Sequence, residues 1–170
     1  GEGARYQFLN RILQGESINN LSIEIPALKG KMGGNTFYSF LIEPDHLLKI
    51  AYVHQRKKNK FEEIADSYQR IINPSRIRSI ENFIDNQKGF FPNSIIVNFQ
   101  YPLKTNEMPK TSKSNLHTSS KPVWLKIPPK FGSAWIIDGQ HRLYSYANSA
   151  LKNKELLSVV TFPVAPSTSK

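Results

Sequence analysis

The stretch that decides the fold reads AWIIDGQHRL and spans residues 134–143. Its first four residues form an apolar run typical of a buried strand. Gly139 follows as the residue best suited to a sharp turn, and Leu143, Tyr146 and Ala147 then recur at helical spacing. The stretch therefore predicts a strand that turns directly into a helix expected over residues 143–151.

The turn between this strand and helix is the candidate functional site. Gly139 would let the backbone pass close to a ligand, and the first helical turn would direct free amide groups and the positive end of the helix dipole at it. His141 and Arg142 add donors suited to phosphate oxygens. On a regular helix from Gln140, we expect His141 nearly opposite the apolar stripe and Arg142 to one side, where both reach a ligand.

A structural interpretation of the same residues stays open. Asp138 would then be the N-cap of the helix, and His141 and Arg142 would be ordinary surface residues of its first turn.

Composition excludes several classes of site. The chain has 170 residues and no cysteine, so disulfides, thiolate metal sites and cysteine nucleophiles are absent. The three histidines outside the motif, His46, His54 and His117, are too dispersed for a metal-ligand spacing. No apolar run approaches the ~20 residues of a membrane-spanning helix. We therefore expect one cytoplasmic domain over residues 1–170 with no membrane partner.

The net charge points to a polyanionic partner. Lysine and arginine number 23 against 13 acidic residues, which gives a formal charge of +10. Such a chain favours nucleic acid, because lysine and arginine release counterions from phosphates. A solvated basic surface is the alternative.

Elsewhere the pattern predicts an α/β domain with a mixed sheet flanked by helices. Expected strands lie at residues 21–28 and 37–42, which form a hairpin, and at 94–99, 123–127, 134–137 and 157–164. Expected helices lie at 5–14, from Pro44 onward, at 61–72, and at 76–86 with Ser75 as its N-cap. Residues 102–121 are polar and predict a flexible insertion. Tyr101, Trp124 and Trp135 are expected in the core, with base stacking as the alternative.

Residues 137–143, IDGQHRL, resemble the signature of the DGQHR-domain family, whose best-known members are DndB-like proteins of bacterial DNA modification systems. Residues 68–70, 76–84 and 91–97 are similar to that family's segment before the motif and to the helix–strand unit of ParB-like nuclease domains. Residues 25–28 resemble the opening strand. The resemblance covers most of residues 21–165.

This resemblance implies a ParB/sulfiredoxin-like fold whose loop-to-helix turn, at Gly139, binds nucleotide or DNA phosphates. Sulfiredoxin-like chemistry is excluded, because it needs a cysteine where Gln140 stands. By resemblance, Asp138 and His141 would position a free or metal-bound water, while Gln140 and Arg142 would contact phosphates.

Gln69, Arg70 and Arg76 form a second candidate set for phosphate binding. Arg70 lies on a polar edge of its expected helix and Arg76 in the first turn of the next, so both would face the Gly139 turn. A solvated helix face is the alternative for Arg76.

The expected function is that of a DNA-modification or defence-associated protein that binds nucleotide or DNA phosphates. It would act as an NTPase or DNA-nicking enzyme with a nucleoside triphosphate and Mg²⁺ or Mn²⁺. The alternatives are a non-catalytic, DndB-like DNA-binding transcriptional regulator and a module completed by another protein of the system. The sequence leaves open the metal, the nucleotide and the oligomeric state.

Overall fold

The computed structural model describes residues 23–53, 72–109 and 118–163 of the chain. Its strands are β1 (Ile23–Met32), β2 (Asn35–Ile42), β3 (Ala51–Tyr52), β4 (Ile95–Phe99), β5 (Lys104–Glu107), β6 (Lys121–Ile127), β7 (Ala134–Asp138) and β8 (Leu157–Thr161). Its helices are α2 (Pro44–Ile50), α3 (Pro74–Asp85) and α4 (Gln140–Ser145).

The eight strands form one sheet in the order β3-β7-β4-β8-β2-β1-β6-β5. β3 pairs with β7 and β4 with β8 in parallel, whereas the other neighbours are antiparallel. The expected α/β fold with a mixed sheet is thus confirmed. Its ParB/sulfiredoxin-like version stays a prediction.

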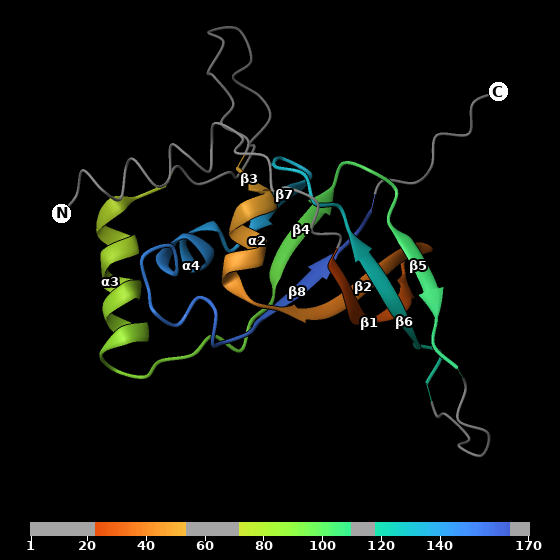
Figure 1. Cartoon of the computed structure of the whole chain (residues 1–170), viewed down its shortest axis with the longest axis horizontal. Helices are drawn as coiled ribbons and strands as arrows, with labels where there is room; N and C mark the ends of the chain where they lie inside the picture. The colour runs from red at the N-terminus through yellow and green to blue at the C-terminus, as the bar shows by residue number, and fades with distance from the viewer. Residues whose placement is uncertain (1–22, 54–71, 110–117, 164–170) are drawn as a thin grey trace, which may run out of the picture.

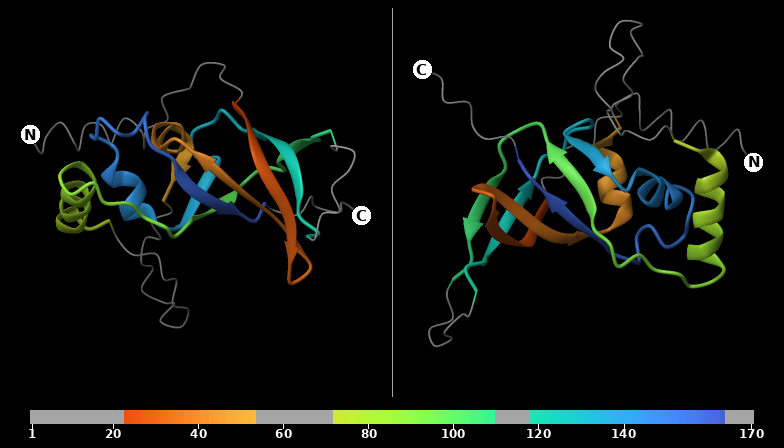
Figure 2. Two further views of the ribbon diagram at one scale, coloured as in Figure 1. Left: turned by 90° about the horizontal axis from the view of Figure 1, so that it is seen from below. Right: turned by 180° about the vertical axis from the view of Figure 1, so that it is seen from behind.

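The helices gather at one end of the molecule and the β1-β6-β5 part of the sheet forms the other (Figures 1 and 2). α3 packs against α4, and α4 also contacts α2. Because α4 follows β7 directly, this helical end contains the DGQHR turn. The opposite end consists of strands in the part of the chain that the structure describes.

The β1–β2 hairpin confirms the predicted pairing of two strands around a glycine turn. Gly33 and Gly34 have φ angles of 55° and 78°, which favour glycine and suit a two-residue hairpin turn. The strands are longer than the pattern predicted, because Lys29, Lys31 and Met32 continue the ladder beyond the apolar core.

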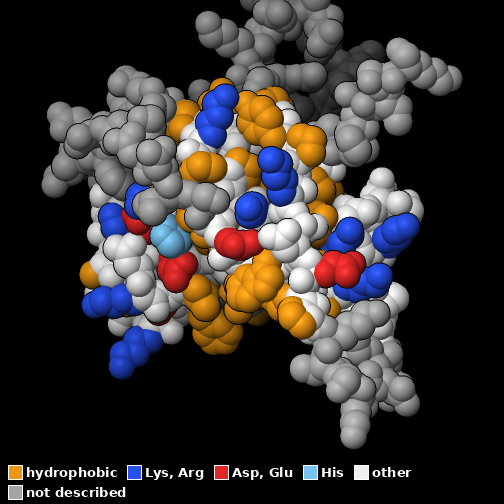
Figure 3. All heavy atoms as spheres, turned by 45° about the vertical axis from the view of Figure 1, so that its right-hand side comes forward, with side chains coloured by type: hydrophobic (Ala, Val, Ile, Leu, Met, Phe, Trp, Pro, Cys, Tyr) orange, Lys and Arg blue, Asp and Glu red, His pale blue; other side chains and the backbone are white. Residues whose placement is uncertain are grey.

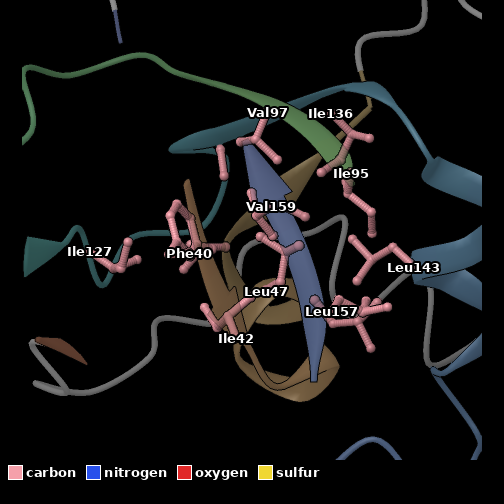
Figure 4. Packing of buried hydrophobic residues seen from close by; sticks show 14 of the residues in the cluster. Phe40, Ile42, Leu47, Ile95, Val97, Ile127, Ile136, Leu143, Leu157 and Val159 are labelled. Carbon is pink, nitrogen blue, oxygen red and sulfur yellow. The ribbon is translucent and has the colours of Figure 1, made fainter. Parts of the chain in front are cut away.

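The core lies on one face of the sheet, where side chains of β2, β4, β7 and β8 meet those of α2 and α4 (Figure 4). Leu47 of α2 and Leu143 of α4 are fully buried there, as are Ile95, Val97 and Val159. Burial alternates along the strands, as in β8, where every second residue is buried. The apolar face of each strand therefore fixes which side of the sheet is covered.

The predicted start of α3 is wrong by two residues. The N-cap is Asn73 and not Ser75, and Pro74 occupies the first helical position. The Asn73 side chain accepts hydrogen bonds from the amides of Ser75 at 3.0 Å and Arg76 at 3.4 Å. Proline has a helical φ and no amide to lose, so it suits the first turn and shifts the cap to the residue before it.

The predicted helix over residues 143–151 is shorter in the structure and begins earlier. α4 ends at Ser145, and the amides of Tyr146, Ala147 and Ser149 bond to carbonyls three residues before them. Tight turns of this kind place apolar residues at nearly the same spacing as an α-helix, so the sequence pattern does not separate the two.

Two expectations near β6 need correction. Tyr101 and Trp124 are not core residues, since 44% and 40% of their surfaces are exposed. Val123, Leu125 and Ile127 point inward, so the alternation of the strand turns Trp124 outward.

The segment expected as a polar insertion contains β5, which pairs with β6 and was not predicted as a strand. The expected helices at 5–14 and 61–72 fall almost wholly outside the described residues, as do Gln69, Arg70 and the basic run 56–60. None of the helices described is long and apolar enough to cross a membrane.

Candidate functional site

The turn from β7 into α4 is built around Gly139. This residue has φ 99° and ψ 12°, a left-handed conformation that suits glycine. A Cβ atom placed there would lie 3.0 Å from Ile95 Cγ1 and 3.0 Å from Arg142 Nη2. Conformation and space therefore both require glycine at this position, as the sequence predicted for a sharp turn.

Arg142 directs its guanidinium group at the backbone that leads into β4. Nη1 donates to the carbonyl of Asn93, and Nη2 donates to the carbonyl of Ser94 at 3.2 Å. Nη2 also lies 3.7 Å from Asp138 Oδ2. The arginine side chain is 16% exposed and that of Asp138 is 70% exposed. Arg142 thus holds the motif to the start of β4, while Asp138 faces solvent.

His141 joins α4 to the beginning of α3. The backbone amide of Asn73 donates to His141 Nε2 at 3.0 Å, and only 7% of the histidine is exposed. Ser145 lies one turn further along, with its hydroxyl 2.5 Å from the His141 carbonyl and 3.3 Å from the Ile77 carbonyl. A ring nitrogen that accepts a hydrogen bond from an amide carries no proton itself, so this contact requires that His141 be neutral, with Nε2 unprotonated.

The expected orientation of His141 is therefore wrong. We expected it opposite the apolar stripe of a regular helix, yet it is buried, as is Gln140 at 6% exposure. The reason is that α4 is covered on two sides, by the core around Leu143 and by α3. Of the four motif residues expected to do chemistry, Asp138 alone is classed as exposed.

Arg76 is exposed in the first turn of α3, three residues after Asn73. Since Asn73 contacts His141, the structure brings this turn of α3 to the DGQHR motif. That the Arg76 side chain faces the Gly139 turn stays a prediction. Gln69 and Arg70, the other members of this set, lie outside the described residues.

The donor set for a metal is sparse. The described residues contain no group of three or more histidine, cysteine, aspartate or glutamate side chains that could hold an ion. Within the motif, His141 Nε2 already accepts a hydrogen bond, which leaves the carboxylate of Asp138. These residues do not fit a metal held by protein ligands alone.

A polar cleft of about 310 Å³ lies beside the second half of α3 and was missed by the sequence analysis. It is lined by Arg78, Glu81, Asn82, Asp85, Asn86 and Asn148. Asp85 accepts a hydrogen bond from the Ser149 hydroxyl at 2.5 Å. The polar residues at helical spacing on α3 are the signal in the sequence that could have indicated it.

Two tyrosines near α4 have raised pKa values. Burial raises the pKa of Tyr144 above its ordinary value, with a smaller effect of Tyr52. Burial also raises the pKa of Tyr146, together with Glu155, to whose carboxylate its hydroxyl donates at 3.1 Å. Both phenols therefore stay protonated near neutral pH.

Comparison with known protein families gives a match. A family model described as DndB, DNA-sulfur modification-associated, matches residues 25–168. No curated protein and no solved structure matches the chain. The matched range includes the DGQHR motif, all three described helices and almost the whole sheet.

Proposed function

The chain belongs to the DndB family of DNA-sulfur modification-associated proteins, and from this premise we propose that it is a non-catalytic DNA-binding protein of such a system. In this role the DGQHR motif organises the fold, and the protein binds DNA phosphates through its basic surface. A DNA-binding regulator of the modification system is the simplest form of this function.

The observation that supports the proposal is the inward use of the motif. Arg142 donates to two backbone carbonyls and His141 accepts from a backbone amide. These two bonds direct the guanidinium at the backbone and leave its side chain only 16% exposed. The Nε2 lone pair of His141, which could otherwise accept a hydrogen bond from a water, is already occupied by the Asn73 amide. Both residues are thus better suited to holding α4, α3 and β4 together than to catalysis.

The net charge of +10 supports the DNA-binding part of the proposal. Lysine and arginine contacts to phosphates dominate the affinity of proteins for nucleic acid and weaken as salt displaces them. Partners other than DNA would be further proteins of the modification system.

The second candidate function is hydrolysis of a nucleoside triphosphate, or nicking of DNA, with Mg²⁺ or Mn²⁺. It is favoured by Asp138, whose carboxylate is 70% exposed at the carboxyl end of β7. A carboxylate in this place would contribute one ligand to a hydrated ion or would orient an attacking water.

Binding and turnover assays separate the two candidates. The purified chain is titrated into labelled duplex DNA at several salt concentrations, and ATP hydrolysis and plasmid nicking are measured with Mg²⁺ and with Mn²⁺. We expect duplex binding whose affinity falls steeply with salt, and no turnover above that of Asp138→Asn.

Asp138→Asn is the informative variant because its side chain is exposed and the fold does not depend on burying it. Turnover by the wild type that this variant loses would establish the catalytic candidate. If the wild type neither binds duplex DNA nor turns over, the proposed DNA-binding function is wrong.

A further inference from the structure

The outer face of β6 carries an exposed tryptophan in an apolar setting. Trp124 is 40% exposed, and its cross-strand neighbours are Pro26 on β1 and Asn106 on β5. Leu28, the next outward residue of β1, is 50% exposed. Trp124, Pro26 and Leu28 together give this face an exposed apolar patch, and such patches, unlike single exposed residues, mark binding surfaces.

Lysines flank this tryptophan on the same face. Lys104 and Lys126 are cross-strand partners, and Lys126 stands two residues from Trp124, about 7 Å along the strand. Neither ammonium group makes an ion pair with a residue that the structure describes. The nearby carboxylate of Glu24 instead accepts a hydrogen bond from Asn106 at 3.2 Å.

A second aromatic residue with a lysine lies beyond the same end of these strands. Tyr101 precedes β5 by three residues and Lys130 follows β6 by three. Lys130 Nζ lies 3.1 Å from the Tyr101 hydroxyl and 5.2 Å from the centre of its ring. Tyr101 is 44% exposed, so a second exposed aromatic group lies in contact with a lysine near this end of the strands.

The charge of this region is mainly positive, although Glu24 on β1 is the cross-strand partner of Lys126. Between residues 100 and 133 the sequence holds six lysines, at positions 104, 110, 113, 121, 126 and 130, and one acidic residue, Glu107. Figure 3, in which the β1-β6-β5 end comes forward, shows hydrophobic side chains beside lysine or arginine side chains on this face, together with some acidic side chains. Protein–protein interfaces are depleted of lysine, so the surroundings of Trp124 favour a polyanion over a protein.

We propose that Trp124, Lys104 and Lys126 form a platform that binds single-stranded DNA, with an unpaired base stacked on the indole and phosphates on the two lysines. This inference rests on the proposed DNA-binding function and names the form of DNA that this face binds. Base faces are open for stacking in a single strand, whereas a duplex hides them. The platform lies on the strand end of the molecule, away from the DGQHR turn (Figure 1).

The test uses the full chain and a fluorescein-labelled 15-nucleotide oligothymidylate, with binding followed by anisotropy. Loss of one stacked base by alanine substitution weakens single-strand binding by about fivefold or more, so we expect that loss for Trp124→Ala. Trp124→Phe retains an aromatic face and should stay within about threefold of the wild type. Lys104→Gln combined with Lys126→Gln should reduce the slope of log affinity against log salt by about 1.4, since each phosphate contact contributes ~0.7 on single strands.

Phe90→Ala is the matched control, because Phe90 is 76% exposed in the loop before β4 and lies outside the platform. It should bind the oligonucleotide like the wild type. Duplex of the same length should bind Trp124→Ala as well as it binds the wild type.

The inference is overturned if Trp124→Ala keeps full affinity for the oligonucleotide. It is also overturned if this variant loses single-strand and duplex binding equally, or if sedimentation shows that it changes the oligomeric state, since Trp124 would then serve an interface between copies of the chain. Binding of duplex DNA by the wild type tests the proposed function independently of this inference.

Discussion

Replacement of Gly139 by alanine should destabilise the protein strongly without removing any expected catalytic side chain. A left-handed backbone costs a residue with a Cβ atom about 1–2 kcal/mol, and φ at this position is 99°. The added methyl group would also meet Ile95 Cγ1 at 3.0 Å, and overpacking of this kind costs about 1–3 kcal/mol. The free energy of unfolding should therefore fall by about 2–5 kcal/mol.

Urea denaturation followed by circular dichroism measures this loss. With a denaturant slope of about 2 kcal/mol/M, the midpoint should fall by about 1 M or more. Gly132→Ala is the matched control, because its φ is 75° but no atom lies within 4 Å of the added Cβ. It should lose the conformational part alone, about 1–2 kcal/mol.

The difference between the two glycine variants therefore measures the packing of the turn against β4. Combining Gly139→Ala with Ile95→Ala removes the clash with Ile95 and leaves only the contact with the flexible end of Arg142. The double variant should therefore lose less stability than the sum of the two single changes. If Gly139→Ala were no less stable than Gly132→Ala, the close approach of the turn to Ile95 would be refuted.

Three further predictions follow from the same region. His141→Phe keeps an aromatic ring in this buried position but leaves the Asn73 amide without its acceptor. The free energy of unfolding, measured by urea denaturation, should therefore fall by about 1–3 kcal/mol, and full stability would contradict the hydrogen bond between α4 and the start of α3. Arg142→Lys keeps the charge but loses the planar guanidinium that donates to two carbonyls. It should lower the melting temperature by about 2–4 °C for each kcal/mol of stability lost and leave the affinity for DNA unchanged. Reduced affinity at an unchanged melting temperature would instead show that the guanidinium binds DNA. Burial, then Glu155, raises the pKa of Tyr146 above its ordinary 10.0. The contribution of Tyr146 to stability is therefore fully present below pH 10 and is lost as the pH rises above 10, because the unfolded chain releases the phenolic proton first. The free energy of unfolding should fall less steeply between pH 9 and 11 in Tyr146→Phe than in the wild type, and equal slopes would show that the phenol titrates alike in the folded and unfolded states.

The parts of the fold that could be predicted are those specified by neighbouring residues. Alternating apolar residues predicted the β1–β2 hairpin, and the glycines between them predicted its turn. The apolar run before Asp138 and the position of Gly139 likewise predicted the junction of β7 and α4. The same alternation contained the outward direction of Trp124, because this residue lies between the inward-facing Val123 and Leu125. We expected it in the core because it sits in a strand-like run.

The parts that could not be predicted depend on distant residues. β5 reads Lys-Thr-Asn-Glu and has no apolar residue, so pairing with β6 alone makes it a strand. His141 looked exposed because its burial depends on α3, which begins 67 residues earlier in the chain. No local pattern reports a contact of that separation, and so the motif could be found from the sequence while the direction of its side chains could not.

The position of β8 has a consequence for the order in which the protein folds. This strand, residues 157–161, comes last among the described strands but lies between β4 and β2 in the sheet. During synthesis, each side of the sheet can form from residues already made, with β3, β7 and β4 on one side and β2, β1, β6 and β5 on the other. The two sides stay separate until Leu157–Thr161 leaves the ribosome. We therefore expect assembly to be completed late and by contacts between distant parts of the chain, which slows folding, and a nascent chain stalled before Leu157 should be digested by protease far faster than the finished protein.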